Sequence, residues 1–310
     1  MRLPRRTHTA SGTIGLDIDG AYLAAAQVEH GHVKRAASEP LPAGLVVHGE
    51  VVDADGLSSA IKEFVRTNGL PRDARLGVGN QQIAVRHLEL PKIADRADRE
   101  AAVRFQASEA MPMPLDDAVI DYSTVGDVVG QDGVPHERVV IVAARRPMIS
   151  RYVDAVRRAG LKPTGVDLDA FALVRVLGGS SGPGPEATRA YCHLGGVTNL
   201  AVAKGGLCVF TRPLSARWEG EQTDVYALAE ELRISMDYYG SQADSEPIGE
   251  VLVSGSGAED LDTVRALDEQ LPVPVSAASP LGTLPGDDFP AGENPYRHTV
   301  SVGLAMGRTA

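Results

Sequence analysis

The stretch TIGLDIDGAYLAAAQVE, residues 13–29, is an apolar run that ends in DIDG and is followed at once by a second apolar run. This pattern predicts two β-strands joined by a tight, acidic turn that contains a glycine. Such a turn can present backbone N–H groups to a phosphate, and a carboxylate to the metal ion that accompanies it. On its own the pattern is weak, because an ordinary Asp-Gly hairpin has the same composition.

A second stretch, residues 190–212 (AYCHLGGVTNLAVAKGGLCVFTR), repeats the arrangement. An apolar run ends in HLGG, a further strand is expected at 200–203, and a glycine turn leads to a third strand at 207–211. The first stretch continues in the same way, through a glycine turn to a strand at 33–36. Two such strand–loop–strand–turn–strand units predict a duplicated core with a cleft between its halves.

Composition excludes several classes of protein. With 30 Lys and Arg against 41 Asp and Glu, the net charge is −11, which argues against a general nucleic-acid binder. Apolar runs long enough to span a membrane are absent from the sequence, and residues 1–12 form a basic tail without the apolar segment of a secretory signal. Cys192 and Cys208 have no metal-ligand spacing and are expected to be buried free thiols of a cytosolic protein.

Strands alternate with helical patterns along both halves, which predicts an α/β fold with mixed sheets. Residues 83–160 are expected to form an α+β subdomain inserted in a first lobe at 13–177. The run GGSSGPGP begins a linker at 178–188, because Gly, Ser and Pro fill every position of the run. A second lobe is expected at 189–310, with a C-terminal helix over residues 296–308 that returns to the core.

Several stretches outside the two strand units resemble the PilM-type proteins of type IV pilus machines, within the actin-like ATPase group that includes the cell-division protein FtsA. They are RFQASEAMPMPLDDAVIDY (104–122), AARRPMISRYVDAVRRAGLKPTGVDLDAFALVRVL (143–177), ELRISMDYYGSQ (231–242) and SVGLAMGR (301–308). The resemblance runs from about residue 13 to residue 308. It implies a bilobed actin-like fold, a duplicated RNase H-like core, that binds nucleotide between its lobes.

By resemblance, three loops would hold ATP and Mg²⁺. Glycine and hydroxyl residues at strand ends suit this role, because the backbone there can approach a phosphate closely. The expected cofactor-binding residues are Asp17, Asp19 and Gly20 in the first loop, Gly195, Gly196, Thr198 and Asn199 in the second, and Gly255, Ser256 and Gly257 on the adenosine side, with Asp17 as the metal ligand.

The phosphate loops depart from the family pattern in ways that disfavour ATP. Asp19 adds a carboxylate where the family has glycine, Tyr22 is bulky where it has small hydroxyl residues, and Ala24 stands where its lysine would fall. His193 replaces the aspartate that begins the second loop. Like charges a few ångströms apart cost about 1–4 kcal/mol at intermediate dielectric. We therefore expect a degenerate nucleotide cleft in which ATP binding is weakened or lost, with no catalytic residue.

In the family the actin-like protein lies at the cytoplasmic face of the inner membrane and captures the cytoplasmic N-terminal peptide of its inner-membrane partner, PilN. The resemblance thus implies a membrane-associated scaffold that also meets other inner-membrane components of the pilus or of a related secretion system. Phe105, Met111 and Met113 are the expected peptide contacts, since methionines beside prolines form an adaptable apolar ledge. The alternatives are an active actin-like ATPase or a small-molecule kinase of the same superfamily.

Three histidines could be assigned chemistry from the sequence. His193 at a strand end could be a base or a ligand, although a structural role is the simpler interpretation. His30 and His32 flank a turn glycine, and without further Cys or His nearby this spacing indicates a hairpin rather than a metal site.

Overall fold

The computed structural model describes residues 12–129, 133–178, 187–218, 220, 222–242, 245–284 and 289–307. The chain forms two compact units, which we call the core unit (up to Asn80 and from Val153 onward) and the inserted unit (Gln81–Tyr152). The expected N-terminal tail and linker lie outside the described residues, apart from residues 12, 178, 187 and 188. Each unit is described by itself below.

The first sheet of the core unit has the strand order β10-β6-β1-β2-β3. β1 pairs antiparallel with β2 and parallel with β6, and all residues of β1 (IGLDI) are buried. The strand bounds are Ile14–Ile18 for β1, Tyr22–Glu29 for β2, His32–Pro40 for β3, Asp73–Val78 for β6 and Lys162–Leu168 for β10.

The second sheet has the strand order β13-β12-β11-β14-β15, the connectivity of the first sheet repeated. β11 pairs antiparallel with β12 and parallel with β14, as β1 does with β2 and β6. The bounds are Thr188–His193 for β11, Asn199–Lys204 for β12, Leu207–Pro213 for β13, Val251–Ser254 for β14 and Val275–Ala277 for β15. We call the parts built on the first and second sheets the first and second lobes.

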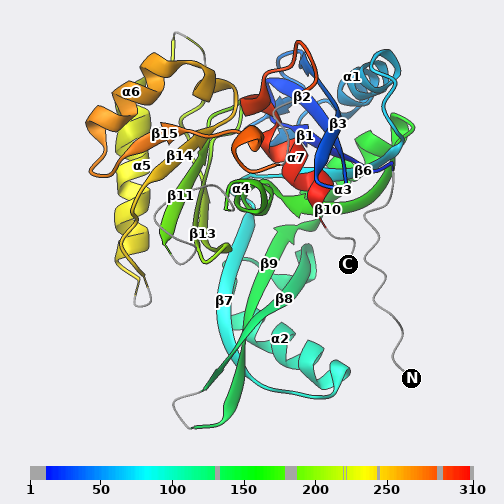
Figure 1. Cartoon of the computed structure of the whole chain (residues 1–310). Coiled ribbons are helices and arrows are strands. Elements are labelled where there is room, and N and C mark those ends of the chain that lie inside the picture. Colours follow the sequence, from blue (N-terminus) through cyan, green and yellow to red (C-terminus); the bar gives the residue numbers. More distant parts are fainter. Residues whose placement is uncertain are drawn as a thin grey trace. The chain divides into compact units, whose positions relative to one another are not determined.

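Helices cover the sheets of both lobes (Figure 1). α5 and α6 pack on the second sheet through a shared apolar core, and α4 and α7 contribute to a core that also contains residues of both sheets. Asp53 begins α1 by accepting hydrogen bonds from two backbone N–H groups of its first turn. The helix bounds are Ala54–Thr67 for α1, Asp169–Leu177 for α4, Val225–Gly240 for α5, Leu261–Gln270 for α6 and Thr299–Met306 for α7.

The C-terminal helix is shorter than the sequence pattern predicts. Residues Pro295–His298 form a 3-10 turn, η4, and α7 begins only at Thr299. The reason is local: the side chain of Asn294 accepts a hydrogen bond from the N–H of Tyr296, and Pro295 occupies the first position of the turn. Similar short turns are Leu115–Asp117, Ser256–Glu259 and Pro280–Gly282 (η1 to η3), and Val46–Val47 and Glu50–Val51 (β4 and β5) form a small hairpin.

The inserted unit is an antiparallel sheet of order β7-β9-β8 with α2 packed on it. Its core contains Val103 and Ala107 of α2 together with apolar residues of the three strands. β8 and β9 are the two longest strands of this unit, with 12 and 11 residues. The bounds are Ile83–Pro91 for β7, Arg96–Ala110 for α2, Ala118–Val129 for β8 and Pro135–Arg145 for β9, after which α3 spans Arg146–Arg158.

Candidate functional site

The first loop lies between β1 and β2 and is closed by the side chain of Asp19. One carboxylate oxygen, Oδ1, accepts hydrogen bonds from the backbone N–H groups of Ala21 (2.8 Å) and Tyr22 (2.6 Å). Gly20 has φ +90°, a conformation that L-residues rarely adopt, so the turn requires glycine. Asp17, near the end of β1, is buried and pairs with Ala24 of β2.

The second loop, between β11 and β12, lies against the first. The N–H of Gly196 donates to Oδ2 of Asp19 at 3.2 Å, a bond that joins the two lobes. A Cβ added at Gly195 would lie 2.6 Å from Asp19 Oδ2, and one at Gly196 would lie 2.5 Å from the carbonyl oxygen of Asp19 and 2.6 Å from the nitrogen of Ala21. Both glycines are therefore needed for the close approach of the loops.

Thr198 and Asn199 end the second loop and are both buried. The hydroxyl of Thr198 has no hydrogen-bond partner among the described residues. A Cβ added at Gly79, at the end of the β6 segment, would lie 2.6 Å from Asn199 Nδ2 and 2.6 Å from Asp169 Oδ2. The amide of Asn199 and the carboxyl of Asp169 thus converge on one glycine of the first lobe.

The third loop follows β14 and contains Gly255, Ser256 and Gly257. Gly255 has φ +86°, and Gly257 leaves room for the indole of Trp218, because a Cβ there would lie 2.9 Å from two ring atoms. The hydroxyl of Ser256 accepts a hydrogen bond of 3.3 Å from Nε of Arg297. Side chains of this chain therefore contact the loop that the resemblance assigns to the adenosine side.

Arg297 links the third loop to the first lobe. Its guanidinium carbon lies 4.2 Å from the ring centroid of Tyr22, and Nη1 donates to the hydroxyl of Ser38 at 3.2 Å. Glu293 accepts from the same hydroxyl at 2.7 Å and contacts Nε2 of His298 at 2.8 Å. These contacts form a polar network between β2, β3 and the η4 segment.

Buried ionisable groups lie at the strand ends beside the first two loops. Burial raises the pKa of Asp17 well above its ordinary value, and the charges of Asp169 and Asp19 raise it further. Burial, followed by the charges of Asp167 and Asp19, raises the pKa of Asp169 to about 8. Burial lowers the pKa of His193 to about 4 against the opposing effect of Asp19. At neutral pH these strand ends therefore hold neutral His193 and two carboxyl groups that resist ionisation.

Residue His193 has the structural environment of a satisfied core histidine. Its Nδ1 lies 3.2 Å from the hydroxyl of Ser254, its register partner on β14, and only 3% of its surface is exposed. Among the residues that the structure describes, no group of three or more His, Cys, Asp or Glu side chains has an arrangement that could hold a metal ion. The cysteines are buried free thiols, and burial raises the pKa of each to about 12.

Three residues near these loops were not predicted from the sequence: Asp169, Trp218 and Arg297. Asp169 begins α4 directly after β10. A carboxylate at the junction of a predicted strand and a predicted helix was the sequence signal that could have identified it. No local pattern marks the other two, because their contacts with Gly257 and Tyr22 form only when the chain folds.

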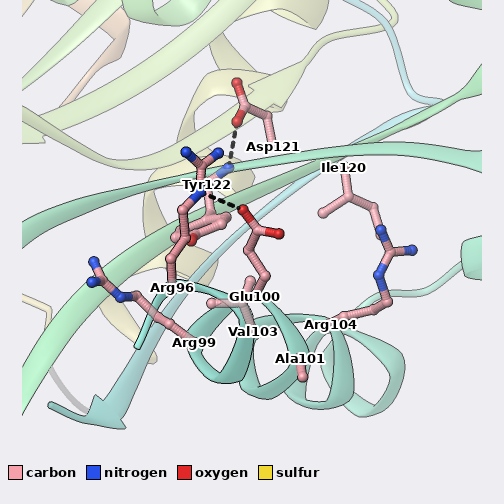
Figure 2. A pocket seen from close by; sticks show the side chains of 9 residues that line it. All are labelled: Arg96, Arg99, Glu100, Ala101, Val103, Arg104, Ile120, Asp121 and Tyr122. Carbon is pink, nitrogen blue, oxygen red and sulfur yellow. Dashed lines mark hydrogen bonds and ion pairs between the residues drawn. The ribbon is translucent and has the colours of Figure 1, made fainter. Parts of the chain in front are cut away.

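A groove of about 690 Å³ lies in the inserted unit between α2 and β8 (Figure 2). Arg96 and Arg104 extend from α2 on either side of Glu100, and Ile120 and Tyr122 contribute apolar surface from β8. The complete lining is Arg96, Arg99, Glu100, Ala101, Val103, Arg104, Ile120, Asp121 and Tyr122. The three arginines and two carboxylates give this groove a basic balance.

The three residues expected to contact a peptide differ in how deeply they are buried. Phe105 follows the groove residue Arg104 on α2 and is 62% exposed. Met111 is 7% exposed and belongs to the core of the inserted unit, against which Met113 packs as a partly buried neighbour. Of the three, Phe105 is the one that presents a largely exposed side chain.

Solved structures define the class of this protein. A protein with an actin-like ATPase fold and unknown function from Bacteroides thetaiotaomicron matches 99% of this chain and 100% of its own (TM-score 0.52, 7% identity). The ethanolamine utilization protein EutJ from Carboxydothermus hydrogenoformans matches 94% and 88% (TM-score 0.51, 13% identity). A PilM–PilN type IV pilus biogenesis complex matches 95% and 98% (TM-score 0.79, 20% identity). The chain has the actin-like fold.

Sequence comparison narrows this class to a family. The family model for type IV pilus assembly protein PilM matches residues 15–215, which include the whole inserted unit. The chain therefore belongs to the type IV pilus assembly protein PilM family, and the resemblance noted in the sequence is confirmed. No helix among the described residues combines the length and the hydropathy needed to span a membrane.

Proposed function

We propose that this protein is a cytoplasmic scaffold in the assembly of a type IV pilus or a related secretion system, held at the inner face of the membrane by a PilN-like partner. Its family and its similarity to a chain of a solved PilM–PilN type IV pilus biogenesis complex support the partner class. Binding would use the cytoplasmic N-terminal peptide of that partner. Other inner-membrane components would join through the partner or through further surfaces.

The groove between α2 and β8 is the observation that carries this proposal. Its volume of about 690 Å³ falls in the range of ligand clefts, and it combines apolar surface with Arg96, Arg99 and Arg104. Arginine is suited to such a site because its planar group pairs with carboxylates and packs on apolar surface at once. The groove therefore fits a short peptide with apolar side chains and at least one carboxylate.

The edge position of β8 offers a second means of recognition. In the order β7-β9-β8, β8 pairs with β9 on one side only among the described strands. An extended peptide can add to such an edge through backbone hydrogen bonds, while side-chain pockets beside the edge provide specificity. Tyr122 and Ile120 of β8 lie on the groove side and would provide those pockets.

We further propose that the nucleotide cleft is degenerate, because the residues present fit ATP and Mg²⁺ poorly. Backbone N–H groups of both phosphate loops already donate to Asp19, and Ala24 supplies no cation. Mg²⁺ requires ionised carboxylates, whereas burial raises the pKa of Asp17 and Asp169 and so favours their neutral forms. A chain with this cleft would act through binding rather than through hydrolysis.

Fluorescence anisotropy with the labelled N-terminal peptide of the partner tests the scaffold proposal on the full chain. Arg104→Glu and Phe105→Ser should each weaken binding by about tenfold or more, because both side chains are exposed beside or within the groove. Arg138→Glu is the matched control, since Arg138 belongs to the same unit but lies outside the groove lining. Unchanged affinity in Arg104→Glu and Phe105→Ser would refute the groove as the binding site.

Met111 is unsuitable for this test. Its side chain lies in the core of the inserted unit, so a glutamate there would bury a charge and unfold the unit whether or not a peptide binds nearby.

A further inference from the structure

The carboxylate of Asp19 has the contacts of a bound anion. It accepts three backbone hydrogen bonds, from Ala21, Tyr22 and Gly196, so the donors come from the loops of both lobes. Only 9% of the residue is exposed. Converging backbone N–H groups at turns form anion-binding concavities, and hydrogen bonds to an ionised acceptor are among the strongest in proteins.

The space between the loops is filled while Asp19 is in place. A single Cβ added at Gly195 would already approach the carboxylate oxygen Oδ2 of Asp19 to 2.6 Å, closer than non-bonded atoms tolerate. A phosphoryl group is larger than a methyl group, so it can enter only if the loops separate or the carboxylate leaves.

Two further contacts involve the loops that the resemblance assigns to a nucleotide. Arg297 stacks on Tyr22 of the first lobe and donates to Ser256 of the second, and Trp218 packs against Gly257. Every loop that the resemblance assigns to a nucleotide is thus in contact with a side chain of the same chain.

We propose that Asp19 is an internal anion: its carboxylate takes the place of a ligand phosphate, joins the two phosphate loops and holds the lobes closed without nucleotide. Removing the carboxylate exposes a latent site for phosphate. The extra carboxylate thus has a positive role in the closed state, beyond the loss of nucleotide binding. Its contacts lie within the core unit alone, so this role does not depend on a peptide at the inserted unit.

The decisive variants are Asp19→Asn and Asp19→Gly. Asparagine keeps one oxygen that can accept the hydrogen bonds from the N–H groups of Ala21 and Tyr22. It removes the negative charge, however, and places an NH₂ donor opposite the N–H of Gly196, so that hydrogen bond is lost. Glycine removes the side chain altogether. The matched controls are Asp53→Asn and Asp53→Gly, because Asp53 also accepts two local backbone hydrogen bonds, from Asp55 and Gly56, without a bond between lobes.

Thermal unfolding is measured with inorganic phosphate and with potassium chloride at matched ionic strength, followed by the fluorescence of Trp218, the single tryptophan of the chain. We expect phosphate to raise the Tm of Asp19→Gly saturably, by about 2–4 °C or more above the chloride effect, because a ligand that binds only the native state stabilises it. Wild type and both Asp53 variants should show no difference between the salts. An equal phosphate effect in wild type and Asp19→Gly overturns the proposal.

Hydrogen exchange at the amide of Gly196 gives a second, independent measurement. We expect Asp19→Asn to accelerate this exchange by about tenfold or more, while Asp53→Asn leaves it unchanged, because an amide that loses its acceptor also loses protection. If Asp19→Gly does not fold, the exchange measured in Asp19→Asn decides alone. Unaltered protection of Gly196 in Asp19→Asn would show that the carboxylate does not join the lobes.

Discussion

The guanidinium carbon of Arg297 lies 4.2 Å from the ring centroid of Tyr22. The sequence assigned Tyr22 only an obstructive role beside the first phosphate loop. In the structure its ring is the surface on which a residue of the η4 segment stacks, and the same arginine donates to Ser256 and Ser38. Arg297 thereby connects elements that lie far apart along the chain.

Replacing Arg297 should destabilise the core unit. We expect Arg297→Ala to lower the free energy of unfolding by about 1–2 kcal/mol, the sum of a partly buried cation–π contact and its hydrogen bonds. Arg297→Lys should recover little, because lysine lacks the planar group that stacks and donates in two directions. Urea unfolding, followed by the fluorescence of Trp218, measures the free energy of unfolding of both variants.

The control for this experiment is Arg265→Ala, which breaks an ion pair with Asp262 whose side chains are 69% and 85% exposed. Such pairs contribute little to stability. If Arg297→Ala costs no more than this control, the stacking contact does not stabilise the cleft.

The contact between the phosphate loops should not tolerate a methyl group. Gly196→Ala places a Cβ 2.5 Å from the carbonyl oxygen of Asp19 and should lower the free energy of unfolding by about 1–3 kcal/mol through forced displacement of the loops. Gly240→Ala is the control, since Gly240 ends α5 with nothing within 4 Å of an added Cβ, and alanine favours helix. Equal stability of the two variants would contradict the packing described here.

Asp169 should make the core unit more stable as the pH falls from 8.5 to 6.5. Its folded pKa of about 8 lies above the ordinary value of 3.8, so between these values the folded state binds a proton that the unfolded state lacks. Tm measured by Trp218 fluorescence should therefore rise as the pH falls through this window. Asp169→Asn should raise Tm at pH 8.5 and reduce the slope.

The control for Asp169 is Asp237→Asn on the exposed face of α5. It should leave the slope as it is in wild type. The prediction fails if Asp169→Asn retains the full pH dependence between 6.5 and 8.5.

His193 should have the opposite effect at lower pH, where its titration makes the folded state less stable as the pH falls. Its folded pKa of about 4 lies below the ordinary value of 6.5, so the unfolded state takes up a proton first and stability falls as the pH drops from 6.5 toward 4. His193→Gln should remove this loss, worth on the order of 3 kcal/mol across the window. His32→Gln, at an exposed position of β3, should leave it intact. Identical acid transitions of the two variants would rule out His193 as the cause.

Local sequence patterns predicted the core elements well. The apolar run of β1, the glycine turn at Gly20 and the repeat of this unit at β11 and β12 were all readable, because strand alternation and turn geometry are properties of a few adjacent residues. Peripheral segments then identified the family. The C-terminal helix was predicted too long, since the η4 turn depends on a cap and a proline that interrupt an otherwise helical composition.

The residues of the candidate site were only partly predictable. The structure brings the first two loops together at Asp19, and in the third loop the N–H of Gly257 donates to the carbonyl oxygen of Leu194. The assignment of these loops to a nucleotide stays a prediction. Met111 is buried and Phe105 is exposed, although they lie only six positions apart in the sequence. Which of the two side chains faces the core is decided by how α2 packs on the sheet, and residue type does not reveal it. Arg297 and Trp218 carried no local signal at all.

Sequence alone determined the duplicated strand units, the family and the presence of an extra carboxylate at Asp19. Only the tertiary structure decided what that carboxylate does. Asp19 and Gly196 are separated by 177 positions, and their hydrogen bond forms only because two similar sheets pack so that their turns meet. Backbone turns are specified within a few residues, whereas the partner of a charge depends on which distant segment the folded core brings within hydrogen-bond distance.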